Sequence, residues 1–205
     1  MGQRLTRLVD LIAQLRDPEG GCPWDRAQDH RTLRPYVVEE AHEVVAAIDG
    51  GDPEELKGEL GDLLLQVLLH SRIAEEAGEF TLDDVMETLA EKLERRHPHV
   101  FGNAPSDLPS IRTRWDQIKA SEKAAEPGRR DVELPPLLAA RKLVSSFPGR
   151  VPIESLLDAA DDEERSGLEL LAAVARAWRS GVDPEIALRK VVDAVRVRSG
   201  GSSGR

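Results

Sequence analysis

Two short acidic clusters, Glu39-Glu40-x-x-Glu43 and Glu59-x-x-Asp62, hold the residues best suited to chemistry. In each cluster two carboxylates are three residues apart (Glu40 and Glu43, Glu59 and Asp62), so in a helix each pair lies on one face. Several carboxylates facing one another between packed helices cannot all stay ionised without compensation. Mg²⁺ supplies it simply, because it takes oxygen ligands and commonly bridges to substrate phosphates. The pattern therefore predicts a divalent-metal site; the alternative is solvated surface charge.

Both clusters lie in strongly apolar sequence with a helical period. In the first helix Glu40 borders a single apolar stripe. In the second, the run from Leu60 to Leu69 is apolar on nearly all sides. At about 100° per residue, one narrow polar strip remains, made of Glu59, Asp62, Gln66 and His70. We expect a helix with so little polar surface to pack on several sides.

Cap and turn residues divide residues 1–124 into helices. Thr32 is a candidate N-cap for the acidic helix, and Gly50-Gly51-Asp52-Pro53 reads as a C-cap, an N-cap and a first-turn proline. Thr81 and Asp84 form a capping-box pattern for a later helix, which Pro98 ends. No stretch alternates as a strand does. The expected fold class is all-α, an antiparallel bundle with helices over about residues 5–15, 33–49, 53–77, 82–97 and 111–123.

The second half of the chain reads as a smaller helical segment. Residues 125–136 have the proline, glycine and charge content of a linker. Residues 137–198 follow, and the glycine- and serine-rich residues 199–205 are expected to be a disordered tail. The helices expected in this segment span about residues 137–144, 153–160, 167–178 and 184–197.

Composition excludes several classes of function. The formal net charge of -10 argues against binding of duplex nucleic acid, and an aromatic content of 3% against base-stacking platforms for single strands. One cysteine, Cys22, excludes an internal disulfide. No apolar run is long enough to span a bilayer and no signal segment is visible, so we expect a cytoplasmic protein without membrane attachment.

Three further stretches accompany the acidic clusters: Cys22-Pro-Trp-Asp25, the run from Lys92 to Phe101, and Trp115-Asp-Gln-Ile-Lys119. Together they resemble MazG-type nucleoside triphosphate pyrophosphohydrolases over about residues 4–123. That family is all-α, binds Mg²⁺, with Mn²⁺ as a substitute, and cleaves nucleoside triphosphates to the monophosphate and pyrophosphate. The resemblance also implies a homodimer or higher homo-oligomer, in which a second copy completes the bundle.

The resemblance assigns roles to particular residues. It implies Glu40, Glu43, Glu59 and Asp62 as metal ligands and catalytic residues, with Glu39 as a supplement. It implies as substrate contacts Lys92, Arg96, Trp115 and Lys119. The chemistry fits, since phosphoryl transfer needs mainly positioning and neutralisation of phosphate charge. Water activated by the metal or a carboxylate would attack the α-phosphorus. Trp115 could stack on a base or pack beside Ile118.

Residues 137–198 look like a decayed second copy of the same domain. When Gly167 is aligned with Gly61, Arg165 stands at the position of Glu59 and Leu168 at that of Asp62. Farther on, Ala194 replaces Lys92 and Arg198 matches Arg96. The substitutions predict that this copy has no metal site and serves packing, dimerisation or regulation.

Other functions are also compatible with parts of this pattern. The chain could be a non-catalytic regulatory or interaction protein that retains the fold, or its substrate could be a narrower nucleotide that is deoxy, damaged or an alarmone. Two Glu-x-x-His pairs, Glu39 to His42 and Glu94 to His97, also occur in ferritin-like di-iron bundles. Pro98 ends the helix directly after the second pair, which argues against a di-iron site.

Overall fold

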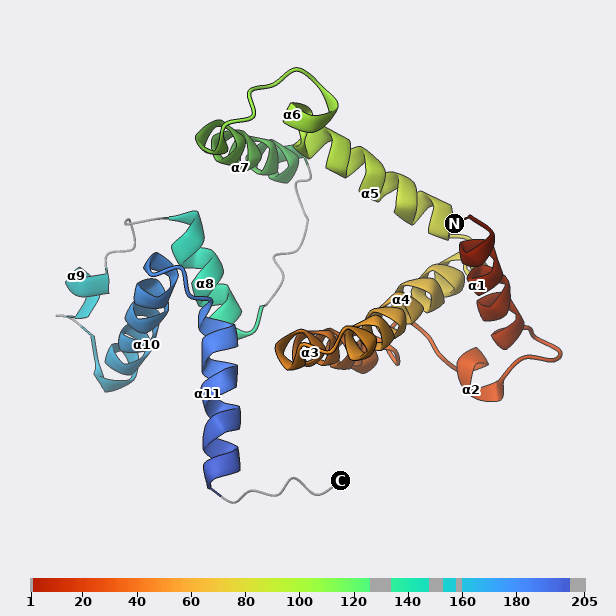
Figure 1. Ribbon diagram of the computed structural model, residues 1–205, viewed down its shortest axis with the longest axis horizontal. Coiled ribbons are helices and arrows are strands. Elements are labelled where there is room, and N and C mark those ends of the chain that lie inside the picture. The colour runs from red at the N-terminus through yellow and green to blue at the C-terminus, as the bar shows by residue number, and fades with distance from the viewer. Residues whose placement is uncertain (1, 126–133, 148–152, 158–159, 200–205) are drawn as a thin grey trace. The chain divides into compact units, whose positions relative to one another are not determined.

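The computed structural model describes residues 2–125, 134–147, 153–157 and 160–199, and every regular element there is a helix (Figure 1). This confirms the all-α fold class. The helices are α1 (Gly2–Leu15), α2 (Pro23–Arg26), α3 (Arg34–Gly50), α4 (Pro53–Glu76), α5 (Leu82–Arg96), α6 (Pro98–Phe101), α7 (Leu108–Ala125), α8 (Pro136–Ser146), α9 (Ile153–Leu157), α10 (Asp162–Arg179) and α11 (Pro184–Arg198). None of these helices is long and apolar enough to cross a membrane.

The chain forms two compact units, Met1–Ala125 and Glu126–Arg205. The division falls where the sequence places the start of the linker. Residues 126–133 of that linker and residues 200–205 of the expected tail lie outside the described residues. The linker, the disordered tail and the decayed repeat therefore stay predictions.

The core of the N-terminal unit joins α1, the start of α3, and the second half of α4. Leu33, directly before α3, is fully buried in it. Partly buried side chains from α1, α4 and α5 pack around this centre. The buried members are Ile12, Leu33, Leu68, Leu69 and Ile73. The apolar period of α1 and α4 in the sequence thus places one core at one end of α4, away from its acidic first half.

The two acidic helices are joined by a tight turn that makes them antiparallel neighbours. Gly51 ends α3 in the left-handed region at φ 78°, a conformation that glycine adopts without steric penalty. The Asp52 carboxylate then accepts a hydrogen bond from the backbone N–H of Glu54, and Pro53 occupies the first turn of α4. The turn predicted from this four-residue sequence is confirmed, and it sets Glu40 and Glu43 beside Glu59.

The start of α3 differs from the prediction, because Thr32 is not its N-cap. The Asp29 carboxylate accepts hydrogen bonds from the N–H groups of Arg31 and Thr32 at 2.8 Å each, and the Thr32 hydroxyl accepts one from the Asp29 N–H. This local turn uses the groups that would have capped the helix. Leu33 is the residue before the first turn, so burial of its side chain fixes the start of α3.

A buried arginine ties the loop before α3 to the helices beneath it. Arg16 is 8% exposed and its guanidinium binds the Glu76 carboxylate at 2.7 Å. The same side chain donates to the backbone carbonyl oxygens of Asp25 at 2.5 Å and Gln28 at 3.2 Å. Because a buried charge is stable only when paired and hydrogen-bonded, this contact holds the loop in place. The entry to α3 is thereby positioned.

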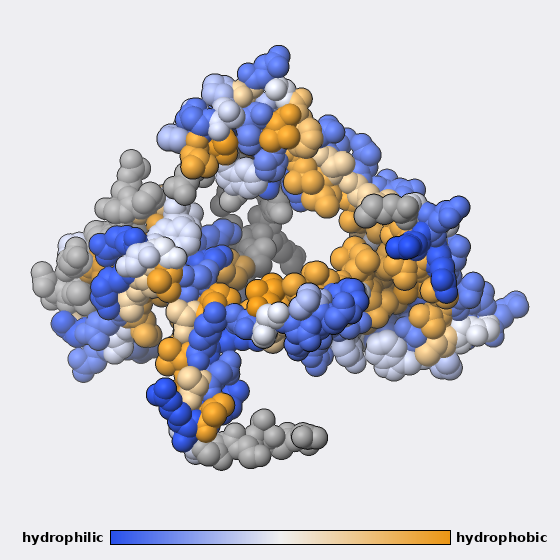
Figure 2. Space-filling view, in the orientation of Figure 1, coloured by the Kyte–Doolittle hydropathy of each residue, from blue (hydrophilic) through white to orange (hydrophobic). Residues whose placement is uncertain are grey.

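The sequence predicted that α4 packs on several sides. Within one chain, the first half of α4 does not. Leu60, Leu64 and Val67 are 50%, 40% and 42% exposed. Met86, Leu89 and Leu93 of α5 are also more than 40% exposed, and Figure 2 shows hydrophobic surface over these helices. α4 is apolar on nearly all sides, but within one chain other helices cover only part of this apolar surface.

The C-terminal unit has its own small core between α8, α9 and α10. Its buried members are Val144, Ile153, Val174 and Ala175. Of the helix predicted over 153–160, Ile153–Leu157 is helical, and residues 158–159 lie outside the described residues. The helix predicted to begin at Gly167 begins at Asp162 instead, because Asp161 and Glu164 form a capping box. An ion pair between Arg141 and Asp183 links α8 to the start of α11.

Candidate functional site

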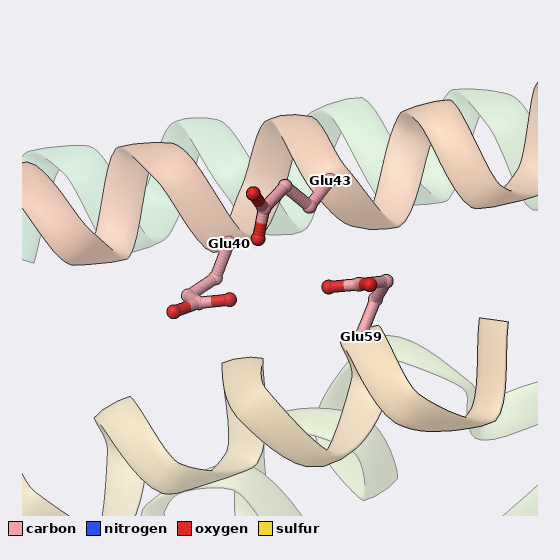
Figure 3. A group of neighbouring side chains, drawn as sticks. All are labelled: Glu40, Glu43 and Glu59. Carbon is pink, nitrogen blue, oxygen red and sulfur yellow. The ribbon is translucent and has the colours of Figure 1, made fainter. Parts of the chain in front are cut away.

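Three of the predicted acids meet between α3 and α4. Glu40 and Glu43 project from α3 toward Glu59 of α4 (Figure 3). One carboxylate oxygen from each residue lies within 4.8 Å of the other two. Glu40 and Glu59 are half-buried, whereas Glu43 is exposed. The antiparallel turn at Gly51 thus converts two sequence clusters into one group of oxygen ligands, here called the acid cluster.

Electrostatics disfavours full ionisation of the acid cluster. Desolvation, followed by the charges of Asp62, Glu43 and Glu39, raises the pKa of Glu40. Desolvation, followed by the charges of Glu43, Asp62 and Glu55, raises the pKa of Glu59. Within the described residues no Lys, Arg or His forms an ion pair with any of the three acids. The like charges are therefore gathered without a compensating cation from the described part of the chain.

The donor set of the acid cluster suits a hard divalent cation. Mg²⁺ and Mn²⁺ bind carboxylate oxygens, and two opposite ligands at about 2.1 Å each would be about 4 Å apart. The spacing within 4.8 Å matches this requirement with small side-chain movements. Three carboxylates leave coordination positions for water and phosphate oxygens. The residues present therefore fit the ion that the sequence predicted.

Asp62 and Glu39 lie outside this group of three. Both side chains are exposed, and neither offers an oxygen within the common 4.8 Å span. Asp62 lies one turn after Glu59 on α4, and its charge raises the pKa of both Glu40 and Glu59. Helical spacing places Asp62 near the face of Glu59, but the arrangement of α3 against α4 decides which oxygens meet.

The other two members of the polar strip of α4 face inward. Gln66 is 5% exposed and its Oε1 accepts no hydrogen bond among the described residues. His70 stacks parallel to His30, with the two Nδ1 atoms 2.7 Å apart. Desolvation and the charge of His30 lower the pKa of His70. The polar strip of α4 thus begins at Glu59, beside α3, and ends at His70, which stacks on His30 from the loop before α3.

Two predicted substrate contacts, Arg96 and Trp115, lie together. The Arg96 guanidinium carbon lies 5.4 Å from the centre of the Trp115 ring, and the His97 ring approaches the same indole edge-on at 5.4 Å between centroids. Arg96 also donates to the Glu122 carboxylate, with Nη2 2.5 Å from Oε2. Glu122 was not among the residues that the sequence predicted, because no spacing rule links positions 26 residues apart.

Lys92 and Lys119 complete the predicted substrate contacts. Lys92 is half-buried on α5, one turn before Arg96. Lys119 lies on α7, but its side chain is outside what the structure describes. Among the described residues no hydrogen bond or ion pair joins Lys92 or Arg96 to the acid cluster. The structure therefore brings together Glu40, Glu43 and Glu59 in one group and Arg96 and Trp115 in another.

Known proteins resemble this chain over most of its length. The family model described as "MazG nucleotide pyrophosphohydrolase domain" matches residues 28–101, which include both acidic clusters, Lys92 and Arg96. The nucleoside triphosphate pyrophosphohydrolase/pyrophosphatase MazG of Thermotoga maritima is 40% identical, covering 89% of this chain and 79% of that protein. A nucleoside triphosphate pyrophosphohydrolase of Escherichia coli K12 is 36% identical, covering 91% and 82%. The crystal structure of a mazG-related protein from Thermotoga maritima aligns with 58% of this chain and 98% of its own, at 26% identity and a TM-score of 0.48.

Proposed function

The chain belongs to the MazG family of nucleotide pyrophosphohydrolases, and from that premise we propose that it hydrolyses nucleoside triphosphates to the monophosphate and pyrophosphate with Mg²⁺ bound. The acid cluster is the observation that carries this proposal. Glu40, Glu43 and Glu59 present oxygens within 4.8 Å of one another, and two of them have a raised pKa. Such a cluster becomes favourable when a divalent cation binds.

The acid cluster would hold the cation between α3 and α4. When bound there, Mg²⁺ or Mn²⁺ would neutralise phosphate charge and supply an activated water. Glu40, Glu43 and Glu59 are the proposed ligands and catalytic residues. Asp62 and Glu39 are proposed as supplements, because their charges already act on the cluster. The carboxylates would position the bound ion for reaction at the α-phosphorus, which depends mainly on positioning and charge.

Lys92, Arg96, Trp115 and Lys119 form the proposed substrate-contact group. Arg96 is suited to phosphate, since a guanidinium offers several N–H donors in a fixed plane. Lys92 stands one turn away on the same face of α5. The half-buried Trp115 offers an aromatic surface for a base or sugar. The acid cluster is negatively charged, and Lys92, Arg96 and Lys119 of the substrate-contact group are positively charged. A nucleoside triphosphate with a bound metal ion carries both signs of charge and therefore suits this pair of groups.

A homodimer is part of the proposal. Leu60, Leu64 and Val67 of α4 and Leu89 of α5 are at least 40% exposed in one chain. Burial of such apolar surface is the main favourable term in subunit association. A second copy would also offer its own Lys92 and Arg96 to the acid cluster. We further propose that the protein works in the cytoplasm, where nucleoside triphosphates are found.

Pyrophosphate release from a mixture of ribo- and deoxynucleoside triphosphates with Mg²⁺ tests the proposal. We expect activity from the wild-type chain and its loss in Glu59→Gln, which keeps the shape of the side chain but removes its charge. The matched control is Glu54→Gln on the same helix, at an exposed glutamate that pairs with Lys57. No release by the wild type would favour the non-catalytic alternative. Release from only one deoxy, damaged or alarmone nucleotide would narrow the substrate class.

A further inference from the structure

Glu122 of α7 holds two arginines of α5 at the same time. Its Oε2 accepts from Nη2 of Arg96 at 2.5 Å and from Nε at 3.2 Å. Its Oε1 accepts from Nη2 of Arg95 at 2.7 Å and from Nε at 2.9 Å. The Glu122 side chain is 20% exposed and that of Arg96 is 22% exposed. The three side chains therefore form a part-buried clamp between two helices, here called the α5–α7 clamp.

The carboxylate engages only one edge of the Arg96 guanidinium. A guanidinium has five N–H donors in one plane, and the contacts of Glu122 are at Nε and Nη2. Among the described residues no hydrogen bond is made by Nη1 of Arg96. Two parallel contacts along one edge fix the orientation of the whole plane. The Nη1 edge is thereby presented to an incoming acceptor.

Trp115 restrains the same guanidinium from its face. The guanidinium carbon lies 5.4 Å from the ring centre, within the range of a cation–π contact. A free arginine loses side-chain conformational entropy when it is ordered. Edge contacts from Glu122 and a face contact from Trp115 impose much of this ordering before any ligand arrives.

The clamp keeps a positive charge despite its carboxylate. The hydrogen bonds from Arg96 and Arg95 lower the pKa of Glu122 from 4.5 to about 2, so this group is ionised at neutral pH. One negative and two positive charges leave a net charge of +1. An anionic ligand is therefore still attracted to the clamp, and Glu122 orients Arg96 without cancelling it.

We propose that Glu122 is a positioning residue for triphosphate binding, acting through Arg96, whose Nη1 edge it presents to a phosphate oxygen. This inference rests on the proposed function, since it takes Arg96 as a substrate contact. It adds to that function a residue outside the stretch matched by the family model, which ends at residue 101. Glu122 touches no reacting atom, and its effect is expected on substrate binding.

Whether Glu122→Gln strengthens or weakens triphosphate binding distinguishes two roles of Glu122, positioning of Arg96 and simple neutralisation of its charge. Glu122→Gln raises the net charge of the clamp by one, so neutralisation alone would make triphosphate bind more tightly. Loss of orientation would make it bind more weakly. In the full chain with Mg²⁺, we expect Glu122→Gln to raise KM about tenfold while kcat stays within about threefold of wild type. Glu122→Asp keeps the charge and should bring KM back to within about threefold of wild type.

A double-mutant cycle shows whether Glu122 acts through Arg96. In an Arg96→Gln background, Glu122→Gln should change KM less than about twofold, because the positioned group is already absent. Glu87→Gln, at an exposed position on the same helix as Arg96, is the matched control and should leave KM within about twofold of wild type. An unchanged or lower KM in Glu122→Gln, or equal effects in both backgrounds, would overturn the proposal.

Binding of a non-hydrolysable triphosphate with Mg²⁺ separates failure of the two proposals. A wild-type chain that binds this analogue but releases no pyrophosphate from hydrolysable nucleoside triphosphates contradicts the proposed function alone. An active wild type with Glu122→Gln unchanged in KM contradicts the positioning role alone. If Glu122→Gln does not fold, Glu122→Asp takes its place in the double-mutant cycle. A KM raised by up to about threefold when Arg96 is present and unchanged in the Arg96→Gln background supports positioning, whereas an unchanged or lower KM, or an equal change in both backgrounds, opposes it.

Discussion

The acid cluster and the α5–α7 clamp are opposite solutions to placing charge between helices. In the acid cluster, Glu40 and Glu59 stand beside other acids, and their pKa values are raised. In the clamp, Glu122 stands beside two arginines, and its pKa falls to about 2. The first site lacks a balancing charge among the described residues, whereas the second is satisfied by the chain itself. Our proposals account for this difference: the acid cluster would bind an ion from solution, and the clamp would hold Arg96 in a fixed orientation.

The largest expected effect comes from Glu43→Gln in the acid cluster. An oxygen of Glu43 lies within 4.8 Å of those of the two other proposed ligands, so loss of its charge should reduce kcat/KM for pyrophosphate release at least about 100-fold. The far-ultraviolet circular dichroism should stay unchanged, because the exposed side chain is outside the core. A variant that keeps more than about a third of wild-type activity would remove the acid cluster from the mechanism.

A smaller effect is expected on the stability of the fold when the pH is lowered until Glu122 is protonated. The pKa of Glu122 is lowered on folding, so the unfolded chain takes up the proton first and the clamp stabilises the fold above about pH 4.5. This stability is lost as the pH falls toward about 2. After allowance for solvent screening we expect a contribution of about 1–2 kcal/mol near pH 6.

Urea unfolding of wild type and Glu122→Gln at pH values from 6 to 3 measures this contribution. The difference in free energy of unfolding between the two chains should shrink as the pH falls. Glu87→Gln, at an exposed position on α5, is the control and should track the wild type. A constant difference across this range would mean that the ion pair adds no pH-dependent stability.

The smallest effect concerns the stability of the metal-free acid cluster, and its sign is opposite to that of the clamp. The pKa of Glu40 is raised on folding, so the folded chain holds its proton longer than the unfolded chain. Stability from this group therefore falls as the pH rises through its raised pKa, and at pH 7 ionised Glu40 destabilises the fold. Glu40→Gln with chelator present should raise the melting midpoint by about 1–2 °C.

Thermal melts of Glu40→Gln with and without Mg²⁺ complete this comparison. Mg²⁺ should raise the midpoint of the wild type, because a ligand that binds only the folded state stabilises it, but not that of the variant. Glu54→Gln serves again as the matched control. A lower midpoint for Glu40→Gln in chelator would show that the acids are not in mutual repulsion.

Local sequence signals determined much of the N-terminal unit. Gly51 and Asp52 predicted the turn between the acidic helices, and Thr81 with Asp84 predicted the capping box of α5, where each partner is three residues away. Thr32 was wrong because Asp29 competes for the same local groups. Local hydrogen bonds are readable from the sequence when one pairing dominates, and ambiguous when two neighbours can both serve.

Contacts between distant segments could not be predicted in this way. The pairs Arg16 with Glu76, His30 with His70 and Arg96 with Glu122 are separated by 60, 40 and 26 residues. Each depends on how two helices or loops meet, which no periodicity encodes. The same limit applies to Asp62, since helical spacing places it one turn after Glu59 but does not determine which oxygens of α3 and α4 meet.

Calorimetric titration of Mn²⁺ or Mg²⁺ into the metal-free chain tests the central claim most directly. If the acid cluster is a metal centre, the wild type and Glu54→Gln should show saturable uptake, and Glu43→Gln should bind at least about tenfold more weakly. Uptake that is absent in the wild type, or equally strong in Glu43→Gln, would contradict the account.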